Sequence, residues 1–291
     1  MGIKNKAMSA LGIDREGPGS VSALNGIRTA SDLAYVSDAK TGHFADVVWT
    51  REPLSPLPVV LFFNGTSYLS TRRDRGSNLC RIIAKRDYLV VNAEFRDLGH
   101  GVSPRDEMED IVSLLAWLEE NRERFAIDLN RIYVTGSSYG ALMALWVAQF
   151  LNGHRMAEVL KMERPDIRVK GLGLFTGMTD TESGDSDMRT IAEAIRELSR
   201  TDKAAAESLC PWSNHDLRVL PPVFQVTSDS DSALPDVVRL DKLLDINAVP
   251  HETVTFHGSG RTVRGFMESN SGGNECARAL SKMFTFFAGD Q

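Results

Sequence analysis

The chain has 291 residues, of which 42% are hydrophobic and 25% are charged. These fractions, with only 23 Gly and 11 Pro, are typical of a globular protein and exclude a collagen-like or low-complexity chain. The formal net charge of −6 argues against a general nucleic-acid binder, because neutralising phosphates requires clustered Lys and Arg. The chain contains six histidines, and any base that works near neutral pH must come from this short list.

The three cysteines, Cys80, Cys210 and Cys276, are widely spaced and form no CxxC or Cys/His pattern. We therefore predict buried free thiols in a reducing compartment, with no metal site, cofactor or disulfide framework. The N-terminal lysines are not followed by the apolar stretch of a secretory signal. No apolar run approaches the roughly 18 residues of a membrane span. The sequence thus predicts a cytoplasmic protein without a membrane span.

Residues 1–40 are polar and rich in Gly and Ser, and we predict that they form an N-terminal arm. Beyond them, apolar runs of strand length alternate with segments whose apolar residues recur at helical spacing. The predicted strands are 47–50, 58–63, 88–93, 131–135, 169–175, 223–227 and 253–256. The predicted helices are 75–86, 104–124, 141–151, 187–200, 235–247 and 273–287. This alternation predicts an α/β domain over 41–291, with a mostly parallel sheet and helices on both faces.

Two segments, the start of the helix at 104–124 and the stretch 178–215, contain further sequence patterns that predict local structure. Ser103 is the predicted N-cap of the helix at 104–124, because Pro104 suits the first helical position and acidic residues fill the first turn. The polar segment 178–215 interrupts the alternation and is predicted to form a small helical cap. Its apolar stripe suits packing on the body of the domain as well as contact with a substrate. The stripe consists of Met188, Ile191, Ile195 and Leu198.

The pattern with the clearest chemistry is Gly136-Ser137-Ser138-Tyr139-Gly140, between a predicted strand and a predicted helix. This is the G-x-S-x-G pattern of a nucleophile elbow in the context that it requires. The turn is so tight that side chains at the two glycine positions would collide with neighbouring backbone. Ser138 is therefore the predicted nucleophile, and the Tyr139 N–H at the helix start is directed at a developing oxyanion.

A second turn, Asn64-Gly65-Thr66-Ser67, follows the most apolar predicted strand. With this turn and the elbow, residues of about 40–290 resemble the α/β-hydrolase superfamily. The resemblance is to its esterase and lipase branch, whose members are feruloyl-esterase-like or hormone-sensitive-lipase-like. The stretches 88–96 and 109–132 also resemble the family's segments before the elbow. The resemblance implies an α/β-hydrolase fold and oxyanion donors at the N–H groups of Gly65 and Thr66. Asn64 stands where the family has His.

The family's triad acid follows the strand at 223–227. Its HGxxD pattern matches Thr227-Ser228 followed by Asp231, so the resemblance implies that Asp231 is the acid. Asp229 is the alternative. An acidic turn after a strand is also ordinary turn chemistry, and this interpretation stays open.

The sequence departs from the family at the base. The family shows Tyr-Pro-Gly-x-x-His-Gly-Phe after its last strand, whereas this chain reads from Phe256 to Phe266 with no His at that place. An ungapped match puts Arg261 there, and a match on the Gly-Phe pair puts Arg264 there. Arginine, with a pKa above about 12, has no neutral form to accept a proton.

Three alternatives follow for the base. His257 lies at the end of the last predicted strand, and His100 lies in a glycine-flanked loop after another strand. The third alternative is that no base exists. Arg261 and Arg264 suit either the surface or bidentate binding of an anionic group, and His100 could also line the substrate pocket.

The leading hypothesis is a carboxylic ester hydrolase for a small-molecule substrate, with Ser138, His257 and Asp231 as its triad. It needs no cofactor or metal. The alternative is a protein of the same fold that lacks a competent triad and binds a ligand or catalyses a non-hydrolytic step, because a fold does not determine a function. Ester turnover that depends on Ser138 would discriminate between them.

Overall fold

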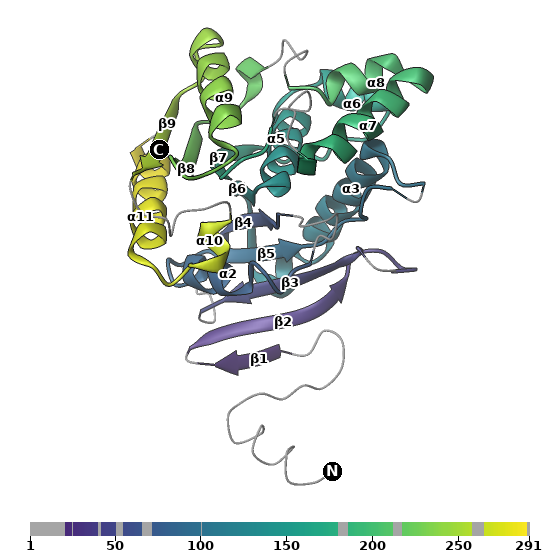
Figure 1. Cartoon of the computed structure of the whole chain (residues 1–291). Helices are drawn as coiled ribbons and strands as arrows, with labels where there is room; N and C mark the ends of the chain where they lie inside the picture. Colours follow the sequence, from purple (N-terminus) through teal and green to yellow (C-terminus); the bar gives the residue numbers. More distant parts are fainter. Residues whose placement is uncertain are drawn as a thin grey trace, which may run out of the picture.

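The computed structural model describes residues 21–24, 26–39, 42–50, 55–65, 72–99, 101–179, 186–211, 217–257 and 265–289. In this part of the chain, nine strands form one sheet in the order β1-β2-β3-β5-β4-β6-β7-β8-β9 (Figure 1). The strands are β1 Val21–Leu24, β2 Ile27–Ala34, β3 Phe44–Trp49, β4 Leu57–Phe63, β5 Leu89–Ala93, β6 Ile127–Ser137, β7 Val169–Phe175, β8 Val223–Ser228 and β9 His251–Phe256.

The strands from β4 to β9 pair in parallel, whereas β1, β2 and β3 pair antiparallel at one side of the sheet. Every residue of β5 and β8 is buried, as are six of the seven residues of β4. Strands covered on both faces have no polar side to display, which is why β4 reads as a continuous apolar run. The prediction of a mostly parallel α/β sheet is confirmed.

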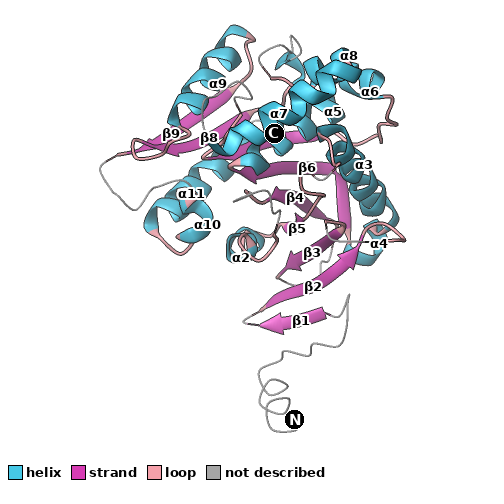
Figure 2. Ribbon diagram, turned by 45° about the vertical axis from the view of Figure 1, so that its right-hand side comes forward, coloured by secondary structure: helices cyan, strands magenta, loops and turns pink. Residues whose placement is uncertain are grey.

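Two hydrophobic clusters show which helices cover which face of the sheet. One cluster joins α3, α5 and the helices α6 to α9 to one set of strand side chains, and the other joins α2, α10 and α11 to the opposite set. Figures 1 and 2 show the same two groups on either side of the sheet. The helices are α2 Ser77–Ala84, α3 Pro104–Glu120, α4 Arg122–Phe125, α5 Tyr139–Asn152, α6 Arg155–Leu160, α7 Ser186–Thr201, α8 Lys203–Ser208, α9 Leu234–Ile246, α10 Phe266–Ser269 and α11 Asn274–Gly289, with a short 3₁₀ turn at Leu217–Val219.

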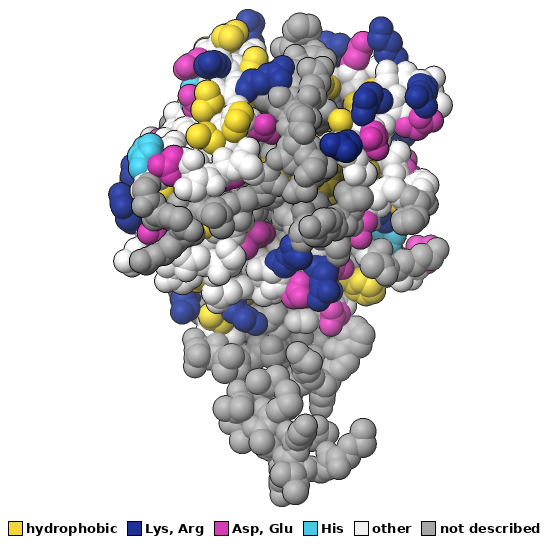
Figure 3. Space-filling view, in the orientation of Figure 1, with side chains coloured by type: hydrophobic (Ala, Val, Ile, Leu, Met, Phe, Trp, Pro, Cys, Tyr) yellow, Lys and Arg dark blue, Asp and Glu magenta, His cyan; other side chains and the backbone are white. Residues whose placement is uncertain are grey.

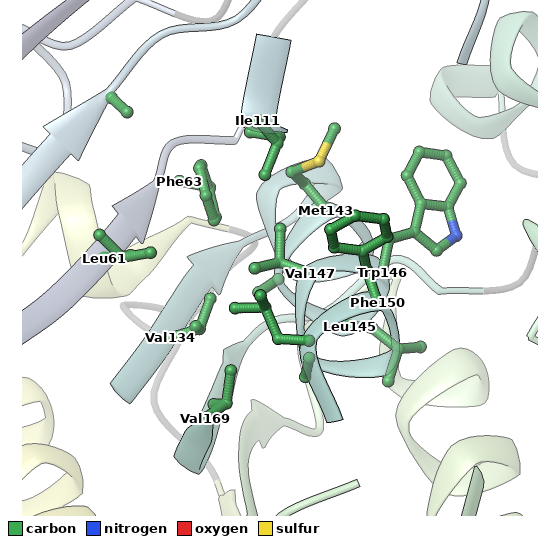
Figure 4. Packing of buried hydrophobic residues seen from close by; sticks show 14 of the residues in the cluster. Leu61, Phe63, Ile111, Val134, Met143, Leu145, Trp146, Val147, Phe150 and Val169 are labelled. Atoms are coloured by element: carbon green, nitrogen blue, oxygen red, sulfur yellow. The ribbon is translucent and has the colours of Figure 1, made fainter. Parts of the chain in front are cut away.

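Helix α5 is the centre of the larger cluster. All of its residues from Tyr139 to Leu151 are buried, because sheet side chains cover one side and helices the other. In Figure 4, Val147 of α5 points toward Phe63 and Val134 of the sheet. The helix that follows the candidate nucleophile is therefore fixed on all sides.

Strands β1 and β2 lie within the segment expected to be an arm, so the sheet begins before residue 41. The sequence of β2, Ile-Arg-Thr-Ala-Ser-Asp-Leu-Ala, has few apolar residues. Its register shifts between Ala30 and Leu33, and Asp32 between them has a φ of 56°. Such a bulge breaks the alternation by which a strand is recognised in sequence.

The predicted cap helix is present as α7, followed by α8. Met188 and Ile191 are fully buried and belong to the cluster around α5, with Ile195 at its margin. The Trp146 indole N–H of α5 donates a hydrogen bond to the Leu209 carbonyl just after α8 (2.8 Å). The apolar stripe of α7 therefore packs on the body of the domain.

Other expectations from composition concern thiols, membrane spans and charge. Cys80, Cys210 and Cys276 are buried and free, as predicted. Among the described helices, none has the length and apolarity needed to cross a membrane. Basic and acidic side chains are interspersed over the described part of the face in Figure 3.

Candidate active site

The Gly136–Gly140 motif forms a sharp turn between β6 and α5. Ser138, at its centre, has φ 53° and ψ −120°, a conformation that L-residues rarely adopt. A Cβ atom at Gly136 would lie 1.9 Å from the Gly140 carbonyl oxygen, and one at Gly140 would lie 2.2 Å from the Phe63 carbonyl oxygen. Both positions therefore require glycine, as the sequence predicts.

Backbone hydrogen bonds hold Ser138 in this conformation. Its N–H donates to the Phe175 carbonyl at the end of β7 (3.0 Å), and its carbonyl accepts from the N–H groups of Ala141 (3.0 Å) and Met178 (3.2 Å). The Ser138 hydroxyl donates to the Met178 sulfur at 3.1 Å, and the residue is 6% exposed. A thioether is a weak acceptor that takes up no proton in water, so Met178 orients the hydroxyl without activating it.

Tyr139 fixes the start of α5 from the other side. Its hydroxyl donates to Glu107 Oε2 of α3 at 2.5 Å, and both side chains are buried. Burial raises the pKa of Glu107 well above its usual range. The Tyr139 N–H belongs to the first turn of α5, where helix N–H groups have no partner within the helix. The Tyr139 N–H can therefore donate a hydrogen bond to a developing oxyanion.

The turn after β4 packs directly against the nucleophile. A Cβ atom at Gly65 would lie 2.9 Å from both the Ser137 carbonyl oxygen and the Ser138 Cβ, so only glycine allows this approach. Buried Asn64, at the family's His position, donates through its amide to Asn92 Oδ1 (2.6 Å). Asn92 in turn donates to the Arg73 carbonyl (2.9 Å). These side-chain bonds fix the strand end from which the predicted oxyanion loop departs.

The acidic turn follows β8 at the same edge of the sheet. Asp231 is 5% exposed, and its Oδ1 accepts a hydrogen bond from the Ala233 N–H (2.9 Å). Asp229 is more exposed and lies 3.6 Å, Oδ2 to Nδ1, from His257 at the end of β9. The structure thus pairs His257 with Asp229, the alternative acid, and buries Asp231 in the turn.

His257 lies apart from the nucleophile. Its side chain is 76% exposed, and in the described part of the chain it shares no hydrogen bond with Ser138, whose hydroxyl bonds to Met178. Strands β6, β7, β8 and β9 are consecutive neighbours, which separates the ends of β6 and β9 by three strand spacings, about 14 Å. The sequence brings both residues to the same edge of the sheet but not into contact.

Four of the predicted site residues, Thr66, His100, Arg261 and Arg264, lie outside the described residues. The structure adds three that the sequence did not indicate, Met178, Glu107 and Glu268. Glu268 of α10 accepts a hydrogen bond from the Gly65 N–H at 3.4 Å. Motif spacing had no means of finding them, because each contacts the elbow or its neighbouring loop from a distant segment.

One group of three potential metal ligands occurs in the described part of the chain. Oxygen and nitrogen atoms of Asp241, Asp245 and His251 lie within 4.8 Å of one another on α9 and the start of β9. His251 Nδ1 is 2.8 Å from the Val249 carbonyl oxygen. This group lies at the amino end of β9, whereas the nucleophile lies at the carboxyl end of β6, so the two are separate.

A serine in a strained strand–turn–helix junction, at the carboxyl edge of a mostly parallel sheet, defines the α/β-hydrolase fold. The family model BD-FAE matches residues 45–237, which is more than half of the chain. The chain belongs to the BD-FAE family. The predicted membership of the esterase branch of the α/β-hydrolases is confirmed, and this membership supports the predicted class of carboxylic ester hydrolase.

Several proteins similar to this chain are esterases. Esterase LipI of Mycobacterium tuberculosis is 26% identical over 224 residues, which are 72% of this chain and 66% of that protein, just under two thirds of its length. Esterase B from Lactobacillus rhamnosis, solved with a tributyrin phosphonate inhibitor, is 20% identical, with a TM-score of 0.80 over 99% of this chain and 90% of that one. Esterase LipW from Mycobacterium marinum has 19% identity and a TM-score of 0.69 over 99% and 86%. The solved structures establish the fold.

Proposed function

We propose that this protein is a serine carboxylesterase that cleaves esters of small or medium-sized molecules through an acyl-enzyme on Ser138. The observation that carries the proposal is the strained backbone of Ser138, enforced by two glycines that can accept no side chain. Such strain persists only where the surrounding structure holds it, and it places the serine hydroxyl at the start of a helix. Membership of the BD-FAE family, together with the esterases among similar proteins, supports an ester as substrate.

In this proposal, Ser138 Oγ attacks the ester carbonyl carbon and the carbonyl oxygen gains negative charge. The Tyr139 N–H and the Thr66 N–H of the turn after β4 stabilise that charge, because the Gly65 N–H donates to Glu268. Collapse of the tetrahedral intermediate expels the alcohol and leaves the acyl group on Ser138. Water then attacks the acyl-enzyme in a second step of the same kind and releases the acid. This chemistry uses no metal or cofactor.

The proposed base is His257, oriented by an acid at the end of β8. Its pair with Asp229 supports this role, since the acid of a catalytic triad lies next to the imidazole that it orients. Buried Asp231 is the second candidate for the acid. The role requires the segment after β9 to carry His257 across the strand ends to Ser138, because three strand spacings separate them.

The second candidate is a ligand-binding or non-hydrolytic protein that uses the same pocket. The exposed position of His257 and the bond between Ser138 and Met178 favour it, because neither gives the serine a base. Arg261 and Arg264, which stand in the family's His region in sequence, would then bind an anionic group of the ligand.

Hydrolysis of p-nitrophenyl acetate and butyrate distinguishes the two candidates. The esterase proposal expects turnover in the wild type, a loss of at least about a thousandfold in Ser138→Ala, and a comparable loss in His257→Ala. His154→Ala is the matched control, because His154 is exposed on the loop between α5 and α6, where α5 ends away from the elbow. A wild type that is inert in these assays excludes the esterase, and full activity in His257→Ala excludes that base.

A gain-of-function variant tests whether the rest of the machinery is intact. Arg264→His and, separately, Arg261→His restore histidine at the two positions that match the family's base in sequence. If the nucleophile, acid and oxyanion donors are in place, one of them raises the rate of ester hydrolysis at least about tenfold at pH 8. No gain in either variant, with native folding retained, means that another component is missing.

A further inference from the structure

Glu268 of α10 contacts the turn after β4, which packs against the nucleophile. Its Oε1 accepts a hydrogen bond from the Gly65 N–H at 3.4 Å, a contact between residues 203 positions apart in sequence. This carboxylate therefore holds the turn after β4, which packs directly against the nucleophile.

The position of Gly65 determines where the predicted oxyanion loop begins. Its backbone lies against Ser137 and Ser138 so closely that a Cβ atom there would be 2.9 Å from both. In this structure the Gly65 N–H points to Glu268, so it holds the loop in place.

Glu268 is itself held by a rigid surrounding. The neighbouring Phe266 and Met267 are fully buried in the cluster beneath α2 and α11. The Gly265 N–H donates to Thr176 Oγ1 (3.4 Å), and Asn78 of α2 donates to Ser271 (2.6 Å). Helix α10 is thus fixed at both ends, and its carboxylate can act as an anchor.

We propose that Glu268 is a positioning residue for the hydrolase proposed above: its carboxylate clamps the turn after β4 onto the nucleophile turn by accepting the Gly65 N–H. The effect of Glu268 on catalysis rests on the proposed function. The hydrogen bond between Glu268 and the Gly65 N–H does not depend on it. Glu268 touches neither the substrate nor the reacting atoms in this role. It acts by holding the oxyanion loop in the geometry that the transition state needs.

The clamp depends on pH. Burial raises the pKa of Glu268 to about 7, while Gly65, Ser137 and the positive charge of Arg75 act in the opposite direction. The other titratable group that faces it from α2 is the Cys80 thiol, whose pKa is raised well above its usual range by burial, so that it stays neutral. The ionised carboxylate accepts the Gly65 N–H more strongly than the protonated one. The clamp therefore strengthens as the pH rises through about 7 and weakens as the pH falls through it.

The test compares Glu268→Gln and Glu268→Ala with the wild type in hydrolysis of p-nitrophenyl butyrate between pH 5.5 and 9. Glutamine keeps an acceptor oxygen without a titratable charge, so Glu268→Gln should keep kcat within about threefold of the wild type. The change in kcat near pH 7 that titration of Glu268 causes in the wild type should be absent from this variant. Glu268→Ala should lower kcat about ten- to a hundredfold with KM changed less than about threefold. Glu120→Ala, an exposed acid at the end of α3, is the matched control. Wild-type kcat in Glu268→Ala overturns the proposal.

A second measurement separates this proposal from the proposed function. In protein labelled with ¹⁵N-glycine, the Gly65 amide resonance should shift with an apparent pKa near 7 in the wild type and should not titrate in Glu268→Gln. This signature needs no turnover. An inactive wild type in which Gly65 titrates contradicts the esterase and supports the clamp, whereas a Gly65 amide that does not titrate contradicts the clamp even in an active enzyme.

Discussion

Two glycines limit what the nucleophile turn can accept. At Gly136 a Cβ atom would lie 1.9 Å from the Gly140 carbonyl oxygen, and backbone on both sides leaves no room for that oxygen to move. Overpacking a rigid core costs about 1–3 kcal/mol when side chains can adjust, and more when the obstacle is backbone. The conformation of Ser138 and the stability of the domain therefore depend on the same residue.

We predict that Gly136→Ala lowers the free energy of unfolding by about 3 kcal/mol and abolishes reactivity at Ser138. The control is Gly272→Ala, because a Cβ atom at Gly272 meets nothing within 4 Å and should change stability by less than about 0.5 kcal/mol. Urea unfolding of both variants measures the difference. Equal stability of the two variants would show that the elbow relaxes and that the close approach is not a constraint.

Glu107 gives a prediction about pH. Burial raises its pKa in the folded protein, whereas in the unfolded chain it ionises above about 4.3. Above that pH the folded state holds a proton that the unfolded state releases, so the free energy of unfolding falls as the pH rises from about 4 toward the raised pKa. Glu107→Gln should flatten this fall, and Glu120→Gln should not. Urea unfolding between pH 4.5 and 7.5 checks this, and parallel curves for Glu107→Gln and wild type would refute it.

The sequence indicates the site only where its residues are contiguous. Gly136 to Gly140 carry their chemistry in five successive positions, so spacing alone finds them. Met178 and Glu268 contact Ser138 and Gly65 from 40 and 203 positions away, and no local pattern encodes such contacts. The base is a different case, because the position that the family's motif gives for histidine holds arginine.

At the level of elements, helix α3 begins as its sequence predicts. Ser103 and Asp106 form a capping box, in which the Ser103 side chain accepts from the Asp106 N–H and the Asp106 carboxylate accepts from the Ser103 N–H, with Pro104 at the first helical position. This helix carries Glu107 to Tyr139. The N-cap thus supports one wall of the site.

We predict that Ser103→Ala lowers the free energy of unfolding by about 1 kcal/mol, the usual effect of losing such a cap. Ser113→Ala is the control, since the Ser113 hydroxyl bonds to the carbonyl four residues earlier on an exposed face of the same helix. Thermal unfolding of both variants gives the comparison. If Ser113→Ala lowered the free energy of unfolding as much as Ser103→Ala does, the N-cap would make no specific contribution to stability.

The buried strands and helices could be predicted from the sequence, whereas the antiparallel strands β1 and β2 at one side of the sheet could not. Strands β4 and β5 and helix α5 are covered on all sides, so their sequences are almost entirely apolar. Strand β2 lies toward the solvent side of the antiparallel part and contains a register shift, which hides its period of two. A partly buried strand mixes polar and apolar residues, so it is harder to recognise as a strand from its sequence.

For the whole molecule, the strand order explains why the site lies where it does. Strands β4, β6, β7 and β8 are parallel neighbours, so the turns after them meet at one edge of the sheet. Those turns hold Gly65, Ser138, Met178 and Asp231. Ligands of open α/β sheets bind at this edge. The fold therefore collects these four candidate residues, whereas His257 at the end of β9 lies apart from Ser138.

The most direct measurement of the central claim is the intact mass of the protein after incubation with a fluorophosphonate, followed by identification of the modified peptide. A nucleophilic serine in a functional elbow predicts the addition of one phosphonyl group per chain, on Ser138, and no addition in Ser138→Ala. Glu268→Ala should be labelled more slowly than Glu268→Gln. A wild type that stays unlabelled, or that carries the label on another residue, would contradict the assignment of Ser138 as the nucleophile.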